Sequence, residues 1–249
     1  KKHIMPKTKE VFESILKVKR IKSRLRLEEK YCDNYRIPEE YSEHGEGIDA
    51  DLIIFVTIDD TGFFLKNDIE AAAIHCLQHA HNKRPIAGYI QFKPELEVVD
   101  TTAKDYMAWL AVHEVSHILV MNDGLYGNFI DSANQPIGSH NVLSSIRHPI
   151  SGNKMQVIKS PKVLEKAREH FGCQNLKGVP LEYNGGPGTA GAHWSKKFMN
   201  TDYMIGDSYG ENLISEITLA LFDDSGWYKV DYNKSNLFLW GREQGCNFF

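Results

Sequence analysis

The residues most able to do chemistry in this sequence form the pattern H-E-x-x-H, at His113, Glu114 and His117. On a helix, residues four apart lie on one face, so the two imidazoles can bind a single zinc ion. Glu114 lies beside them, where it can take a proton from a zinc-bound water molecule. Such a match arises by chance in a chain of this length on the order of a few per cent of the time. The pattern therefore favours a zinc hydrolase. The alternative is a buried helix with two incidental histidines.

A catalytic zinc ion has three protein ligands and one open position, so a third ligand must come from elsewhere. The downstream histidines are His140, His148, His170 and His193. His193 ranks first because it follows the glycine-rich segment 185–191, and glycines let the backbone approach a metal closely. A carboxylate ligand, Glu211 or Glu216, is the alternative.

A second group of residues with metal-binding side chains comprises His75, Cys76, His79 and His81. The segment 69–81 has apolar residues four apart, which predicts a helix on which His75 and His79 share one face. No glutamate follows His75, so the pattern does not support hydrolysis there. We expect a solvated helix face, with an accessory metal site as the alternative.

Hydrophobic periodicity and turn residues indicate the elements that must position these side chains. The most informative is a helix over 102–121, because it carries the H-E-x-x-H pattern. Further helices are expected at 8–18, 161–171 and 211–224, strands at 51–57 and 86–92, and a turn at 59–62. The segment 122–160 shows no sustained period and is expected to be mostly loop.

Length and charge limit the class of protein. A chain of 249 residues can bury a sizeable core unaided, so a metal site would serve function rather than folding. The net charge of −4 argues against a nucleic-acid-binding protein. One basic run, 17–26, is expected to be a solvated edge, with a polyanion or membrane-surface patch as the alternative. No run of 18 apolar residues occurs, so we expect no transmembrane segment.

The first residues contain neither a methionine start nor the apolar stretch of a signal peptide. We interpret the sequence as a processed or partial chain whose N-terminal region lies outside it. The cysteines are Cys32, Cys76, Cys173 and Cys246. Their number is compatible with two disulfides in any of three pairings. None forms a C-x-x-C pair, which argues against a cysteine zinc site.

A set of motifs occurs in order along most of the chain. The motifs are Y-C-D at 31–33, R-P-I-A-G-Y-I at 84–90, H-E-V-S-H at 113–117, A-R-E-H-F-G-C at 167–173, G-T-A-G-A-H-W at 188–194, Tyr203-Met204, and S-E-I-T-L-A-L-F-D-D-S-G-W-Y at 215–228. This set resembles the leishmanolysin family of cell-surface or secreted metzincin peptidases. Many zinc peptidases share H-E-x-x-H alone, whereas the ordered set with G-x-x-G-x-H-W and a nearby methionine is far more specific.

The resemblance implies one Zn²⁺ ion bound by His113, His117 and His193, with Glu114 as the general base. It implies that Met204 forms the Met-turn, a tight turn whose side chain underlies the metal. From the residues alone, Met204 would be an ordinary core methionine.

The resemblance also implies an α+β fold of the zincin or metzincin type with two lobes. Residues 1–121 would form an upper lobe with a twisted sheet, ending in the active-site helix. Residues 122–249 would form a lower lobe, mostly helix and loop, with the third zinc ligand and the Met-turn.

The family likeness pairs Cys32 with Cys76 and Cys173 with Cys246. Disulfides persist in oxidising compartments, so we expect an extracellular or cell-surface protein that follows the secretory route. A glycosylation sequon at Asn233 is consistent with this location. Membrane anchoring, where it occurs, is expected from regions outside the sequence. The alternative is a cytosolic protein with four reduced cysteines.

Two features depart from the family pattern. Metzincins usually have glycine three residues after the second motif histidine, and here that residue is Val120. The turn is then displaced to 122–124, or the helix runs on. The signal and pro-segment and the cysteine-rich C-terminal region of the family precursor are also absent from the sequence.

The sequence therefore predicts a zinc-dependent endopeptidase that acts on a peptide or protein substrate through a zinc-bound water and a glutamate base. The substrate is expected to bind as an added edge strand. One alternative, favoured by Val120, is a catalytically inactive leishmanolysin-like protein of the cell surface, with a role in adhesion. A protein without catalytic activity has no need to keep all four of His113, Glu114, His117 and His193, so their presence weighs against this alternative. Another alternative is a zinc hydrolase of a different lineage with a carboxylate ligand.

Overall fold

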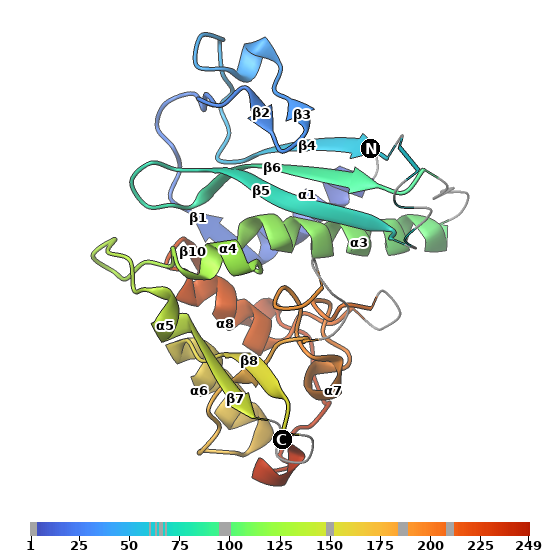
Figure 1. Cartoon of the computed structure of the whole chain (residues 1–249), viewed down its shortest axis with the longest axis vertical. Helices are drawn as coiled ribbons and strands as arrows, with labels where there is room; N and C mark the ends of the chain where they lie inside the picture. The colour runs from blue at the N-terminus through green and yellow to red at the C-terminus, as the bar shows by residue number, and fades with distance from the viewer. Residues whose placement is uncertain are drawn as a thin grey trace. The chain divides into compact units, whose positions relative to one another are not determined.

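The structure is a computed structural model that mixes helices and strands in an α+β fold. It describes residues 4–59, 61, 62, 64, 67, 69–94, 101–147, 152–183, 189–207 and 212–249. The chain divides into two compact units, and Figure 1 shows their helices and strands. We call Lys1–Glu13 with Val18–Leu119 unit 1, and Ser14–Lys17 with Val120–Phe249 unit 2.

A three-stranded sheet organises unit 1. Its strands are β4 (Ile53–Ile58), β5 (Ala71–Gln78) and β6 (Pro85–Phe92), in the order β4-β6-β5. β4 runs parallel to the central β6, and β5 runs antiparallel to it. The strands expected at 51–57 and 86–92 are confirmed as β4 and β6.

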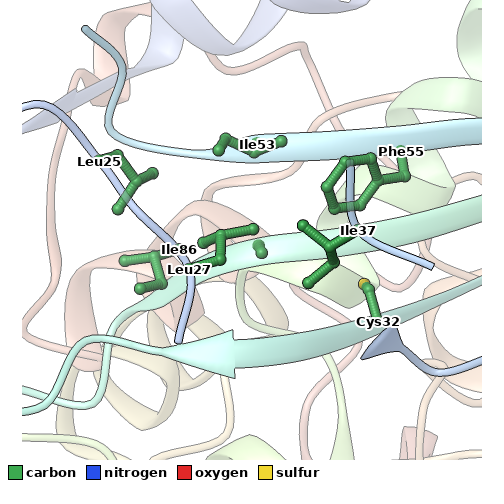
Figure 2. Packing of buried hydrophobic residues seen from close by; sticks show 8 residues of the cluster. Leu25, Leu27, Cys32, Ile37, Ile53, Phe55 and Ile86 are labelled. Carbon is green, nitrogen blue, oxygen red and sulfur yellow. The ribbon is translucent and has the colours of Figure 1, made fainter. Parts of the chain in front are cut away.

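The segment that precedes the sheet in sequence packs against the sheet. It contains the short strands β2 (Tyr31–Cys32) and β3 (Tyr35–Arg36) and the 3-10 helix η1 (Glu39–Tyr41). The buried cluster consists of Leu25, Leu27, Cys32, Ile37, Ile53, Phe55, Ile86 and Ala87 (Figure 2). Burying one leucine or isoleucine side chain contributes about 1.5–3 kcal/mol, so this cluster stabilises unit 1.

The long helix α3 (Thr101–Leu119) packs against β5 and β6 (Figure 1). The helix expected at 102–121 is confirmed, and it ends two residues earlier. A glycine in β6 allows the close packing, because a Cβ atom on Gly88 would lie 2.5 Å from Cγ2 of Ile118. Since Ile118 follows the second motif histidine directly, this contact fixes how the motif helix lies on the sheet.

The helix expected at 69–81 is wrong, because most of that segment forms strand β5. Its alanines, leucine and glutamine favour a helix locally. The backbone of β5 instead pairs with β6, with Ala73 opposite Ile90 and His75 opposite Gly88. Non-local pairing and the packing of α3 outweighed the local preference. The helix expected at 8–18 is partly confirmed, since α1 spans Ile4–Ile15 and β1 spans Leu16–Val18.

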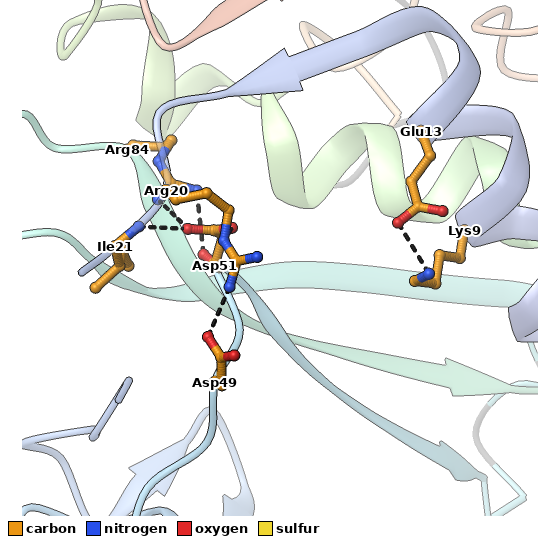
Figure 3. Close-up of polar contacts among 7 residues, drawn as sticks. All are labelled: Lys9, Glu13, Arg20, Ile21, Asp49, Asp51 and Arg84. Atoms are coloured by element: carbon orange, nitrogen blue, oxygen red, sulfur yellow. Dashed lines mark hydrogen bonds and ion pairs between the residues drawn. The ribbon is translucent and has the colours of Figure 1, made fainter. Parts of the chain in front are cut away.

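Most side chains of the basic run 17–26 are exposed, as expected for a solvated segment. Arg20 forms ion pairs of 2.7 Å with both Asp49 and Asp51, and Arg84 donates to the backbone carbonyl of Asp51 (Figure 3). Figure 3 also shows the ion pair between Lys9 and Glu13 on α1. The charge of Arg20 is therefore paired with carboxylates of unit 1 itself.

Unit 2 contains a second sheet, in the order β7-β8-β9. β7 (Leu143–Arg147) and β8 (Lys154–Ile158) are antiparallel, and β9 (Val179–Pro180) pairs with β8. The expectation that 122–160 is mostly loop is therefore wrong for these two strands. Each strand is only five residues long, which is too short for a clear period, and their mutual hydrogen bonds decide the conformation.

The helix α6 (Pro161–Phe171) has the bounds expected from sequence and packs against α8 (Glu216–Asp224). α6 ends at Phe171, and the next residue, Gly172, closes the helix with its left-handed conformation (φ 66°). α8 begins later than the expected 211–224, because the Ser215 side chain caps it by accepting from the Thr218 N–H. The remaining elements are α4 (Asp123–Tyr126), α5 (Ser139–Val142), α7 (Lys196–Met199), β10 (Tyr228–Val230), which pairs with β1, η2 (Tyr232–Lys234) and η3 (Cys246–Phe248).

The chain turns directly after α3, although Val120 replaces the expected glycine. α3 ends at Leu119, and Val120 is fully buried. Asn122 then caps α4 by accepting from the Gly124 N–H at 2.9 Å. The helix therefore does not run on, and the next short helix begins within the expected turn at 122–124.

Both expected disulfides are present. Cys32 bonds to Cys76 in unit 1, with 5.1 Å between Cα atoms, and Cys173 bonds to Cys246 in unit 2, with 4.8 Å. Within the described part of the chain, no helix has the length and apolar character needed to cross a membrane.

Candidate metal centre

The helix α3 brings His113 and His117 together, one turn apart. Their Nε2 atoms are 3.0 Å apart, and their rings meet edge to face with centroids separated by 4.7 Å. Two nitrogens on one tetrahedral zinc ion would be roughly 3.3 Å apart at the usual bond length. The pair therefore needs little rearrangement to share one ion.

Glu114 lies on the same helix and is buried, with 5% of its surface exposed. Burial raises the pKa of its carboxyl to about 8. Removal from water penalises the charged form, whereas a cation bound nearby would favour the carboxylate. The protonation state of Glu114 therefore depends on what the two neighbouring histidines hold.

His193 belongs to unit 2 and lies in irregular chain after Gly191. Its Nδ1 lies 3.0 Å from the carbonyl oxygen of Thr189. Since a carbonyl can only accept, Nδ1 carries the proton in this hydrogen bond, and Nε2 presents a lone pair. Burial also lowers the pKa of His193, which favours the neutral imidazole that binds metals.

His113, His117 and His193 form a group whose ligand nitrogens all lie within 4.8 Å of one another. Among the described residues, this is the one group of three or more histidine, cysteine or carboxylate side chains that could hold a metal ion. Three imidazole nitrogens match the ligand set of a catalytic zinc ion, in which a fourth position stays open. The three side chains brought together are the three that sequence reasoning selected.

Met204 is fully buried in unit 2 and is tied to the residue that follows His193. Its carbonyl oxygen accepts from the Trp194 N–H at 2.9 Å, and Ile205 forms a parallel bridge with Trp194. Its own N–H donates to Asp202 Oδ1 at 2.8 Å. Met204 therefore lies in a turn stabilised by the Asp202 side chain.

The other ligand candidates lie elsewhere. His140 is exposed on α5, His170 contacts the Trp240 carbonyl at 2.9 Å, and Glu216 forms an ion pair of 2.8 Å with Lys166. His148 and Glu211 fall outside the described residues.

The group at 75–81 does not form the expected helix face. His75 and Cys76 lie on strand β5 rather than on a helix, at an irregularity in its pairing with β6, and Cys76 is in a disulfide. His79 and His81 follow the end of β5. The helical spacing that suggested an accessory metal site therefore does not exist.

Sequence reasoning gave no role to Asp202 or Thr189. Asp202 is buried and hydrogen-bonded to Met204, and Thr189 uses a backbone carbonyl that no motif can reveal. The available signal for Asp202 was its position two residues before Met204, where aspartate commonly accepts from the backbone N–H of a turn.

The α+β fold and the three-histidine group place this chain in the class of proteins whose H-E-x-x-H helix and third histidine could bind a metal ion. The chain matches the family described as Leishmanolysin over residues 1–249. It therefore belongs to the leishmanolysin family, a family of metallopeptidases.

Several relatives share this similarity. A leishmanolysin-like peptidase of Caenorhabditis elegans is 31% identical over 248 residues, covering 87% of this chain and 37% of the relative. A leishmanolysin homolog of Crithidia fasciculata is 31% identical over 219 residues, covering 88% and 30%. A ciliated left-right organizer metallopeptidase of Xenopus laevis is 28% identical over 225 residues, covering 88% and 31%. The chain spans about a third of the length of these relatives.

Proposed function

We propose that this protein is a zinc-dependent endopeptidase in which His113, His117 and His193 hold the metal and Glu114 is the general base. The observation that carries the proposal is the three-histidine group, with a glutamate adjacent to one of its members on α3. Family membership supports the same reaction class, because relatives of this chain bear the names of peptidases.

The residues of the chain have separate tasks in this reaction. Zinc would supply a Lewis acid that polarises the scissile carbonyl and makes a water molecule more acidic. Glu114 would take the proton from that water and pass it to the leaving amine. The hydrogen bond from His193 Nδ1 to Thr189 keeps the Nε2 lone pair available as a ligand. Burial of Glu114 and His193 excludes bulk water from the groups that bind metal and move protons.

The wider features of the protein follow the same proposal. We assign Met204 to the Met-turn, and residues 1–121 and 122–249 to the two lobes of a metzincin-like fold. Peptides or proteins would be the substrates. Two disulfides are consistent with an extracellular or cell-surface location.

Zinc analysis combined with a peptide-cleavage screen tests the proposal. Glu114→Gln should retain zinc and lose almost all peptidase activity, since an amide cannot accept the proton at neutral pH. Glu10→Gln, at an exposed position on α1, is the matched control and should behave as wild type.

Three results would contradict the proposal. If wild-type protein binds no zinc, the proposed metal is wrong. If Glu114→Gln retains substantial turnover, Glu114 is not the general base. Zinc binding without cleavage of any substrate by wild type would instead favour the non-catalytic surface protein.

A further inference from the structure

A buried carboxylate in unit 2 accepts four hydrogen bonds. Asp202 is 1% exposed, and its Oδ1 accepts from the Met204 N–H at 2.8 Å. Its Oδ2 accepts from the Ser215 hydroxyl at 2.5 Å, the Thr218 hydroxyl at 2.7 Å and the Ser215 N–H at 3.3 Å. Burying a carboxylate is costly unless such donors replace its hydration. Asp202 is therefore the shared acceptor that joins the Met204 turn to the first turn of α8.

The same carboxylate fixes the direction of the hydrogen bonds around it. A carboxylate can only accept, so the single hydroxyl proton of Thr218 points at Asp202. The Thr218 oxygen then accepts from the indole Nε1–H of Trp194 at 2.7 Å. Trp194 is completely buried, and its backbone N–H donates to the Met204 carbonyl. Both the side chain and the backbone of Trp194 are thus held by groups that Asp202 holds.

The peptide plane between His193 and Trp194 is held on both edges. The Trp194 N–H donates to Met204, and the His193 carbonyl accepts from the Glu182 N–H at 2.9 Å. Because the peptide unit is planar, these two bonds set its orientation and so the direction in which the His193 side chain leaves the backbone. A change at Asp202 would reach His193 through this plane.

We propose that Asp202 is a positioning residue for the third metal ligand, acting on His193 through Met204, Thr218 and Trp194. The inference rests on the proposed function, because it takes His193 as a ligand. Groups that orient a metal ligand from behind usually change metal affinity by about 10–100-fold when they are removed. Asp202 should fall in that range although it does not touch the metal ligands itself.

The test compares two carboxylates of unit 2. Asp202→Asn keeps the size of the side chain but places an N–H₂ group among donors. Asp224→Asn is the matched control, because Asp224 accepts from the Lys162 and Val163 N–H groups at the start of α6. Zinc affinity is measured by chelator competition, well below the unfolding temperature of each variant.

We expect Asp202→Asn to weaken zinc binding by about 10–100-fold and to shift the indole N–H resonance of Trp194. Asp224→Asn should lower thermal stability and leave both readouts unchanged. If Asp202→Asn binds zinc as tightly as wild type, Asp202 has no positioning role. If both variants lose zinc affinity equally, the role of Asp202 is merely structural.

A second pair keeps the inference testable where Asp202→Asn does not fold. Thr218→Val removes the hydroxyl that links Asp202 to Trp194, whereas Thr218→Ser keeps it. Zinc affinity should fall by about 10-fold or more in the valine variant and stay near wild type in the serine variant. Equal affinities in the two variants contradict the proposed link.

The proposed function and the inference fail in different ways. Wild-type protein that does not bind zinc contradicts the function. The inference is then decided in metal-free protein, by the ¹⁵N resonances of the His193 ring, which report which nitrogen carries the proton. Asp202→Asn must change these resonances while Asp224→Asn does not, and unchanged resonances in both variants reject the positioning role.

Discussion

In unit 1, His113 and His117 are held by one regular helix, whereas in unit 2 His193 is held in irregular chain by bonds from several segments. α3 brings its two Nε2 atoms within 3.0 Å through helical spacing alone. His193 depends on Thr189 for its ring, on Glu182 for its carbonyl and on the Trp194 N–H for its peptide plane. The helix-held pair is therefore local in sequence, and the loop-held ligand is not.

The two regions are therefore vulnerable to different changes. The positions of His113 and His117 change only if α3 moves or unfolds as a unit. The position of His193 can change when a hydrogen bond is lost in a segment distant in sequence.

Removing a ligand from either region should have the largest effect. His113→Ala and His193→Ala each leave two protein ligands, so zinc binding should weaken by more than the roughly 100-fold that is typical of outer partners. Metal content after dialysis and chelator competition measure the loss.

His140→Ala is the control, since His140 is exposed on α5 and lies outside the three-histidine group. If His193→Ala keeps its full zinc content and Glu216→Ala loses zinc, the third zinc ligand is a carboxylate and not His193.

Removing each disulfide tests how much it stabilises the unit in which it lies. In the chain-entropy model, closing 44 residues with Cys32–Cys76 or 73 residues with Cys173–Cys246 contributes about 4 kcal/mol each. Replacing both cysteines of one pair by serine should lower the free energy of unfolding by a similar amount in each case.

Urea unfolding measures this effect, and non-reducing peptide mapping of alkylated native protein checks the pairing. Free thiols at all four positions would remove both disulfides and the support that they give to an extracellular location.

A smaller effect is expected from added bulk between the sheet and α3. In Gly88→Ala, the new methyl group would meet Ile118, so the free energy of unfolding should fall by about 1–3 kcal/mol. Zinc affinity should also fall, because the helix-held pair moves with α3.

Gly127→Ala is the matched control, since its nearest atom, the Ser139 Cβ, is 3.8 Å from the new Cβ. Adding Ile118→Ala to Gly88→Ala should recover part of the space, and a double-mutant cycle measures this coupling. Fully additive effects would show that the two residues do not determine the packing of α3.

The elements whose pattern is long or well bounded could be predicted from the sequence. The motif helix, strands β4 and β6, and α6 with its closing glycine all follow from periodicity and end signals. Local pattern only ranked His193 first among the candidate third ligands, because the glycines before it let the backbone approach a metal. It left Glu211 and Glu216 as alternatives, and the family resemblance implied His193. The disulfide pairs came from family resemblance rather than from local pattern.

The information that could be read directly from the sequence is therefore local: it identifies residues that could bind metal and those that share a helical turn. The tertiary structure decided that Ala71–Gln78 is a strand, because its backbone groups find partners on β6. It also decided the surroundings of His193, because the Thr189 carbonyl and the buried Asp202 act through backbone contacts and long-range hydrogen bonds. Such contacts leave no spacing to read, since they depend on where distant segments meet after folding.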